Sequence, residues 1–375
     1  MNPPPPAARP ALLAWPWIIN RREDLWWLSG GALAAWLLCA LVVGWGANLI
    51  VVWFVWVTLI DTPHFFGTYS RTFLQREEWQ RRRGLLLGSC GLLLAGPLAI
   101  LVCAILHRAG VVWYAWPWKL FVAWFLFEAY WHVLRQHYGI LALYSRKNGE
   151  TAPADRAIDR WAMHLALLAP AAGFLAKNPE ARTAFGLTAL PAAPVVAATA
   201  AVAAGAAVAL FGRQIWRWRA GAPLNGPKLI FLLAVLPVQA FVSFHPAVAV
   251  APLLAYSIFV TVHHDFQYQA IVWFWHRNRR LASGATGRVT RNLATFLASG
   301  LAMAVVFRLL GCSLEITEGC VPVIHTSTRQ LFGEISLREL LTGVFLGFPL
   351  QHYLLDRHIW RPSRDAALAR DLRVA

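Results

Sequence analysis

The sequence predicts an all-α polytopic membrane protein, a transmembrane bundle of about ten helices with both termini on the cytoplasmic side. Three observations lead to this fold class. Of the 375 residues, 58% are hydrophobic and 14% are charged, whereas a soluble domain carries roughly 25% charged residues. Apolar stretches close to the ~20 residues needed to cross a bilayer recur along the chain. Arginines gather between alternate stretches, as cytoplasmic loops require.

By this length criterion we expect ten helices, at 25–46, 48–70, 85–106, 112–144, 161–178, 192–213, 228–243, 247–275, 292–311 and 338–360. They would form a single transmembrane domain over residues 23–361. The proline-rich residues 1–22 are expected to form a disordered cytoplasmic tail, and residues 362–375 a short basic cytoplasmic tail. Because His245-Pro246 follows the short seventh helix, a tight turn or a broken helix is expected there.

The basic residues predict the orientation of these helices. With a cytoplasmic N-terminus, 26 of the 34 Lys and Arg residues fall in inside segments, 5 fall outside and 3 lie within helices. This asymmetry places both termini in the cytoplasm and requires an even number of helices. The net charge of +16 is then explained by cytoplasmic loops near lipid headgroups. Membrane lipids are the expected surroundings, nucleic acid is not an expected partner, and we expect a bacterial inner membrane protein.

Six histidines lie in the second halves of expected helices 2, 4, 8 and 10, namely His64, His132, His137, His263, His264 and His352. All four helices run from outside to inside. His64, His264 and His352 precede the arginine at the end of their helix by seven, thirteen and nine residues, which places them within roughly 10 Å of one depth. Ionisable groups inside membranes are rare unless they serve a function, and imidazole is the commonest metal ligand. The sequence therefore predicts a metal centre in the cytoplasmic half of the bundle.

Carboxylates accompany these histidines, one helical turn away or directly adjacent: Asp61, Glu128, Asp265 and Asp356. Each is either a further metal ligand or a group that orients a histidine ring. His132 and His137 are about 140° apart on an ideal helix, so both can bind only if the helix distorts or two ions are present. Hydrogen bonds beside the metal are expected from the candidate catalytic residues, Tyr138, Gln267 and Tyr268.

Nitrogen and oxygen ligands without thiolates suit non-haem iron, zinc or copper. The HxxxxH of His132 and His137 and the adjacent His263 and His264 resemble the histidine boxes of integral-membrane desaturases and hydroxylases, although the HxxHH boxes of that family are absent. A second resemblance, to bacterial carotene-cleaving dioxygenases, lies in histidines spread singly over several helices. These resemblances imply one or two non-haem iron ions, oxidation of a lipid-soluble substrate such as an acyl chain or isoprenoid, and an electron-donor protein as partner.

The sequence is also consistent with other functions, with another metal and with two states of a cysteine pair. A proton-coupled transporter would use Asp61, Glu128, Arg135 and the histidines as a relay. A haem protein would pair axial histidines from facing helices, and zinc would replace iron in a non-redox site. Cys312 and Cys320 share an expected outer loop, where a disulfide and two reduced thiols are both consistent with the sequence.

Overall fold

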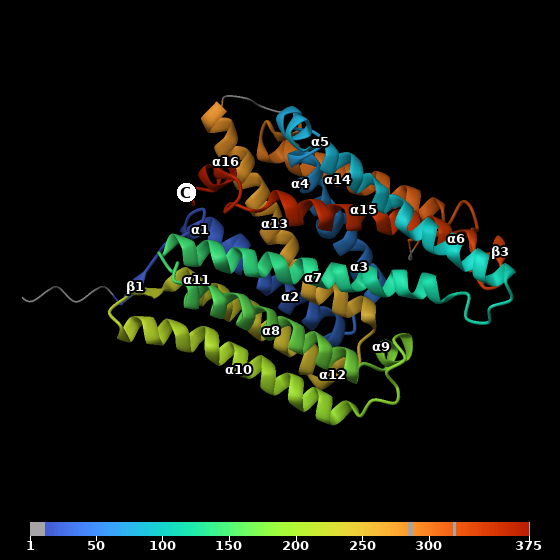
Figure 1. Ribbon diagram of the computed structural model, residues 1–375, viewed down its shortest axis with the longest axis horizontal. Coiled ribbons are helices and arrows are strands. Elements are labelled where there is room, and N and C mark those ends of the chain that lie inside the picture. Colours follow the sequence, from blue (N-terminus) through green and yellow to red (C-terminus); the bar gives the residue numbers. More distant parts are fainter. Residues whose placement is uncertain (1–11, 284–287, 318–319, 375) are drawn as a thin grey trace, which may run out of the picture. The chain divides into compact units, whose positions relative to one another are not determined.

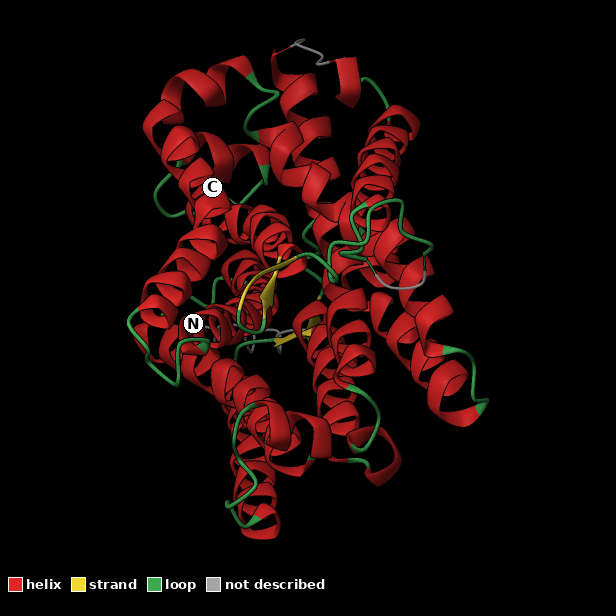
Figure 2. Cartoon of the chain, turned by 90° about the vertical axis from the view of Figure 1, so that its right-hand side faces the viewer, coloured by secondary structure: helices red, strands yellow, loops and turns green. Residues whose placement is uncertain are grey.

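The structure is a computed structural model that describes residues 12–283, 288–317 and 320–374. Helices make up nearly all of the described chain, with two short strand pairs (Figure 2), so the predicted all-α class is confirmed. The chain divides into two compact units. Of the described residues, the first unit comprises those up to Cys39, Leu134–Tyr256 and Val374, and the second comprises those within Ala40–Val133 and Ser257–Arg373. Helices α7 (Trp116–Lys147) and α13 (Leu253–Ser283) contribute to both units.

Two long helices of the first unit, α8 and α10, pack side by side (Figure 1). The elements that lie wholly in this unit are β1 (Leu13–Ala14), α1 (Arg21–Glu23), the π-helical turn η1 (Asp24–Ser29), α2 (Gly31–Cys39), α8 (Pro153–Lys177), α9 (Pro179–Ala184), α10 (Ala192–Arg219), β2 (Leu224–Asn225), α11 (Gly226–Phe244) and α12 (Pro246–Ala249). Strands β1 and β2 pair in parallel, with Leu13 opposite Leu224. The break expected at His245-Pro246 is present between α11 and α12.

A buried ionic network ties the loop after α7 to α8 and α11 in the first unit. Lys228 Nζ donates to Glu150 Oε2 at 2.7 Å and to Asp159 Oδ1 at 2.8 Å. Glu150 also accepts hydrogen bonds from the side chains of Gln214 and Asn225 at 2.8 and 2.9 Å. All of these side chains are buried. Because each charge has an opposite partner and further hydrogen bonds, this network has the form in which buried ions are stable.

The second unit contains the remaining elements: η2 (Ala40–Gly44), α3 (Leu49–Trp56), η3 (Val57–Asp61), α4 (Thr62–Arg71), α5 (Arg76–Ser89), η4 (Cys90–Leu94), α6 (Ala95–Arg108), η5 (Arg288–Thr290), α14 (Leu293–Ser313), β3 (Gln330–Phe332), β4 (Ile335–Ser336), α15 (Leu337–Ile359) and α16 (Ala366–Asp371). Helix α15 packs against α6 (Figure 1). A Cβ atom added at Gly96 would lie 2.3 Å from the Cα of Gly343. Only glycine at both positions lets the two backbones approach this closely.

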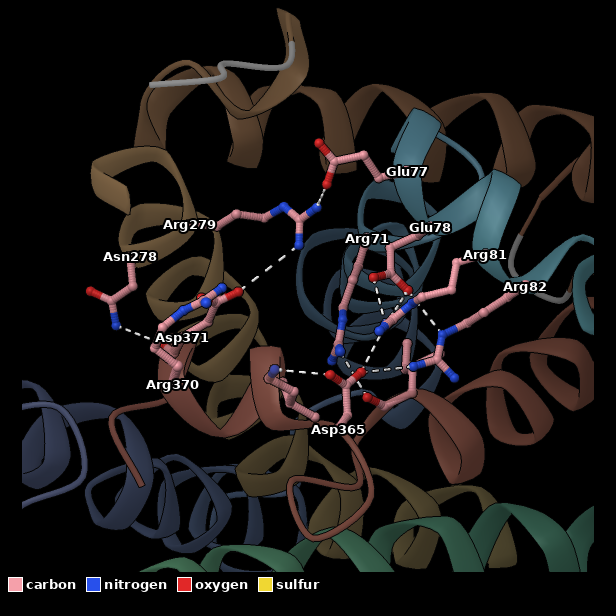
Figure 3. Close-up of polar contacts among 12 residues, drawn as sticks. Arg71, Glu77, Glu78, Arg81, Arg82, Asn278, Arg279, Asp365, Arg370 and Asp371 are labelled. Carbon is pink, nitrogen blue, oxygen red and sulfur yellow. Dashed lines mark hydrogen bonds and ion pairs between the residues drawn. The ribbon is translucent and has the colours of Figure 1, made fainter. Parts of the chain in front are cut away.

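The C-terminal helix α16 is held to the rest of the second unit by charged side chains (Figure 3). Asp365 Oδ2 accepts hydrogen bonds from Arg81 at 2.8 Å and from Arg82 at 3.0 Å. Asn278 donates to the backbone carbonyl of Asp371 at 2.7 Å. The segment expected as a short basic tail, 362–375, therefore contains a helix. Of the expected N-terminal tail, residues 1–11 lie outside the described residues, and the rest includes β1 and the start of α1.

Six helical segments of the described chain are long and apolar enough to cross a membrane: Arg21–Gly44, Leu49–Arg71, Arg76–Arg108, Ala192–Arg219, Gly226–Phe244 and Leu293–Ser313. This supports a membrane protein. Each of the ten expected ranges also coincides with helix, but α7, α8, α13 and α15 carry more polar residues than an apolar span does. Ten membrane crossings and cytoplasmic termini stay predictions.

Candidate metal centre

Four buried histidines from four helices meet in the second unit. His64 lies on α4, His132 on α7, His264 on α13 and His352 on α15, and one ring nitrogen of each lies within 4.8 Å of those of the others. Neighbouring rings meet edge to face, with centroid separations of 4.6 Å for His132 and His352 and 5.1 Å for His64 and His264. Four imidazoles with ring nitrogens this close together offer a donor set that could hold a transition metal.

A local helix distortion precedes His64. The helix that includes α3 and α4 contains the π-helical turn η3 (Val57–Asp61), and Pro63 follows at the start of α4. Proline lacks a backbone N–H, and a π-helical turn is one way in which a helix accommodates this loss. Such turns also rotate the side chains that follow them and occur often at functional sites.

Gly67 allows α13 to approach α4 one turn beyond His64. A Cβ atom at this position would lie 2.7 Å from the Tyr268 ring. Any larger residue would therefore clash with Tyr268, and glycine avoids this clash. The Tyr268 ring then packs with Phe66, Val272 and Phe296 in a buried apolar cluster. This close approach of α13 positions His264, one turn before Tyr268 on the same helix, beside His64.

Hydrogen bonds to Thr68 orient His352. Thr68 Oγ1 donates to Asp356 Oδ1 at 2.6 Å and lies 2.7 Å from Nδ1 of His352. A hydroxyl group has a single proton, so towards His352 it accepts, and Nδ1 carries the ring proton. Tyr268 O–H donates to the same Asp356 oxygen at 2.8 Å. The lone pair of His352 is therefore on Nε2, which faces the other histidines.

Nε2 of His352 lies 3.1 Å from Nε2 of His64. With metal–nitrogen bonds of about 2.0–2.1 Å, two imidazoles on one tetrahedral ion have nitrogens about 3.3 Å apart. The two nitrogens form a hydrogen bond in this structure, and their spacing is also close to the separation of two ligands on one ion.

Four buried polar atoms around the centre have no hydrogen-bond partner among the described residues: His64 Nδ1, His132 Nε2, Asp265 Oδ1 and Asp356 Oδ2. Buried polar atoms are otherwise almost always satisfied. Asp356 Oδ2 lies 3.9 Å from His132 Nε2 and 3.8 Å from His352 Nδ1. His132 Nε2 and Asp356 Oδ2 are left without partners beside the four histidines, and a metal ion would satisfy them, so the residues present fit a bound cation.

Other residues expected at the site are not members of the four-histidine group and have different contacts. His137 and Tyr138 belong to the first unit, where His137 faces Phe231 with ring centroids 6.2 Å apart and Tyr138 faces His164 at 5.2 Å. Glu128 accepts a hydrogen bond from Arg357 at 2.7 Å. His263 lies 2.8 Å from the Gln267 side-chain nitrogen. Of the HxxxxH and His-His patterns, His132 and His264 are the members that join the cluster.

Thr68 and Trp56 are site residues that the sequence analysis did not identify. Thr68 contacts His352, and Trp56 Nε1 donates to Asp265 Oδ2 at 3.1 Å. Thr68 follows His64 by four residues, so the two share a helix face, and this spacing is the signal that could have indicated it. Trp56 offers no comparable signal, because tryptophans are frequent in this chain.

No family model matches the chain, and no curated protein or solved structure is found to be similar to it. The four imidazoles and their surroundings are therefore the features from which a function can be inferred.

Proposed function

We propose that this chain is a membrane-embedded, metal-dependent oxidoreductase that oxidises a lipid-soluble substrate at a non-haem iron centre. The observation that carries the proposal is the convergence of His64, His132, His264 and His352, with ligand nitrogens within 4.8 Å of one another. Four helices far apart in sequence each contribute one buried imidazole. Ionisable groups inside a membrane protein are costly to bury and are typically functional.

Iron is favoured by the donor set and the surroundings. Imidazole and carboxylate ligands without thiolates suit iron, and open coordination positions are typical of non-haem iron oxygenases. A bound iron ion would supply the activation of dioxygen for oxidation of the substrate. Membrane helices around the centre would give a lipid-soluble molecule such as an acyl chain or isoprenoid access to it, and would keep water scarce.

The residues around the histidines would exclude water and orient the ligands. Tyr353 stacks on His132 with ring centroids 4.7 Å apart, and Phe65 lies against His352 at 4.9 Å. Tyr268 and Thr68 both donate to Asp356 Oδ1, which leaves Oδ2 directed towards His132. Asp356 is therefore the group best placed to accept a proton at Oδ2 during turnover.

A haem group fits these contacts less well than a single ion does. A haem with two axial histidines needs a planar macrocycle between the rings, whereas His64 and His352 approach to 3.1 Å between their Nε2 atoms. The other two histidine rings lie edge to face against this pair. A small cation fits among four mutually contacting rings, which favours the non-haem centre over the haem alternative.

Metal analysis of the purified protein tests the proposal. We expect bound iron in the wild-type protein and its loss in His64→Ala, His132→Ala, His264→Ala and His352→Ala. His358→Ala is the matched control, because His358 Nδ1 lies 2.8 Å from the Leu354 carbonyl on the same α15 helix, outside the cluster. A protein that binds no metal, or that binds zinc alone when iron is supplied, would overturn the proposed iron centre.

The substrate class is tested separately in cells that express the chain. Lipid extracts from cells with the wild-type protein and with His352→Ala are compared by mass spectrometry. Oxygenated or desaturated lipids that depend on His352 are the expected result. If metal binds but lipid extracts do not differ, the metal centre stands and the proposed lipid oxidation is wrong.

A further inference from the structure

His64 presents its second ring nitrogen to two carboxylates. Nδ1 of His64 lies 3.1 Å from Asp265 Oδ1 and 3.8 Å from Asp61 Oδ1. The opposite nitrogen, Nε2, faces His352. One imidazole therefore stands between the four-histidine cluster and a separate group composed of Asp61, His64 and Asp265.

The short approach between His64 and Asp265 is not a hydrogen bond. Both His64 Nδ1 and Asp265 Oδ1 are buried polar atoms without a hydrogen-bond partner among the described residues. The two side chains are 3% and 0% exposed, so solvent does not satisfy these atoms. A nitrogen and an oxygen that each bind one ion at about 2.0–2.2 Å lie roughly 3 Å apart, which is the observed spacing.

The negative charges of the two carboxylates in this group also favour the binding of a cation. Asp61 and Asp265 are two carboxylates in one largely buried place, and among the described residues Asp265 accepts one hydrogen bond, from Trp56 Nε1 to Oδ2. Arg308, on α14, is the cation that acts on Asp61. One arginine leaves the pair with an excess negative charge, and buried carboxylates without a counter-charge either bind a metal or lose their charge.

We infer that Asp61, Asp265 and Nδ1 of His64 form a second divalent-cation site, which shares the His64 ring with the first centre. The inference rests on the proposed function for the first ion and adds a second. Two carboxylates and one imidazole favour a harder cation than four imidazoles do, such as manganese, iron or zinc. With both sites filled, His64 would be held through both ring nitrogens as an imidazolate, and its Nδ1 proton would be released to solvent.

Metal stoichiometry tests this site on the full-length protein in detergent. The protein is saturated with Zn²⁺, passed through a desalting column and analysed for zinc per chain. We expect two ions for wild type and one for Asp265→Asn and for Asp61→Asn. Asp365→Asn is the matched control, because it removes a carboxylate of the same unit that bonds Arg81 and Arg82 instead. It should retain both ions.

The outcomes separate the second site from the first. One zinc ion in wild type and in both variants would overturn the second site and leave the first intact. Two ions in the variants would likewise overturn it, since the second ion would lie elsewhere. No zinc in any protein would overturn both proposals.

Saturation with Cu²⁺ gives a second measurement, made on wild type, that does not depend on the folding of a variant. Two copper ions bridged by one imidazolate are magnetically coupled, so electron paramagnetic resonance should show a strongly reduced signal relative to the copper content. A full signal from isolated ions would contradict the shared His64 ring.

Discussion

Thr68 Oγ1 lies 2.7 Å from Nδ1 of His352, and both side chains are fully buried. Because Thr68 donates its own proton to Asp356 at 2.6 Å, it accepts from His352 and fixes which ring nitrogen has the lone pair. The tautomer of His352 with its lone pair on Nε2 thus depends on a residue that is not itself a candidate metal ligand. Residues that form hydrogen bonds with metal ligands often affect metal affinity nearly as strongly as the ligands themselves.

Replacement of Thr68 should weaken metal binding without removing a ligand. Thr68→Val keeps the shape of the side chain but cannot accept from His352, so metal affinity is expected to fall about 10–100-fold. Thr68→Ser retains the hydroxyl and should restore most of the affinity. Competition with a chelator of known affinity measures both variants. Equal affinity of Thr68→Val and wild type would show that Thr68 does not orient His352.

The sequence predicts part of the histidine cluster, because the depth of a histidine within its own helix can be counted from the end of that helix. His64 and His352 were identifiable from their distance to the arginines at the helix ends. Which member of a pair faces the cluster was not identifiable, because helix rotation depends on packing. His132 joins the cluster while His137 packs against Phe231. Glu128 was expected beside His132, but its partner is Arg357 on α15, a contact that no local pattern indicates.

Loss of the buried Lys228 charge should destabilise the first unit. Lys228→Met leaves Glu150 and Asp159 without their shared cation, and breaking a buried ion pair in this way costs about 3–5 kcal/mol. Thermal unfolding in detergent should show a clearly lower midpoint. Lys119→Met is the control, because Lys119 is exposed and its loss should change the midpoint little. Similar midpoints for the two variants would contradict the stabilising role of the network.

Asp365 should make the attachment of α16 sensitive to acid. Burial by itself raises the pKa of the Asp365 carboxyl, but hydrogen bonds from Arg81 and from the Leu368 backbone N–H outweigh it and hold this pKa below its ordinary value of 3.8. The folded protein therefore binds fewer protons at this site than the unfolded chain does. The stabilisation is fully present above pH 3.8 and is lost as the pH falls through the lower pKa of the folded state.

Asp365→Asn removes this titration and should flatten the dependence of stability on pH in the acid range. The unfolding midpoints of wild type and Asp365→Asn are measured from about pH 3 to pH 6. The difference between them should be largest at pH 6 and should shrink towards pH 3. A difference that stays constant over this range would mean that the Asp365 pKa is not lowered in the folded protein.

Cys312 and Cys320 form a disulfide in the structure, whereas Cys39, Cys90 and Cys103 are free. Alkylation of the denatured, unreduced protein should therefore modify only the latter three cysteines, and reduction should expose the other two. Cys312→Ser is the control and should make Cys320 reactive without reduction. Disulfides persist in oxidising compartments, so a disulfide in protein from native membranes would also support the outer location predicted for this loop. Modification of both cysteines before reduction would contradict the bond and remove that support.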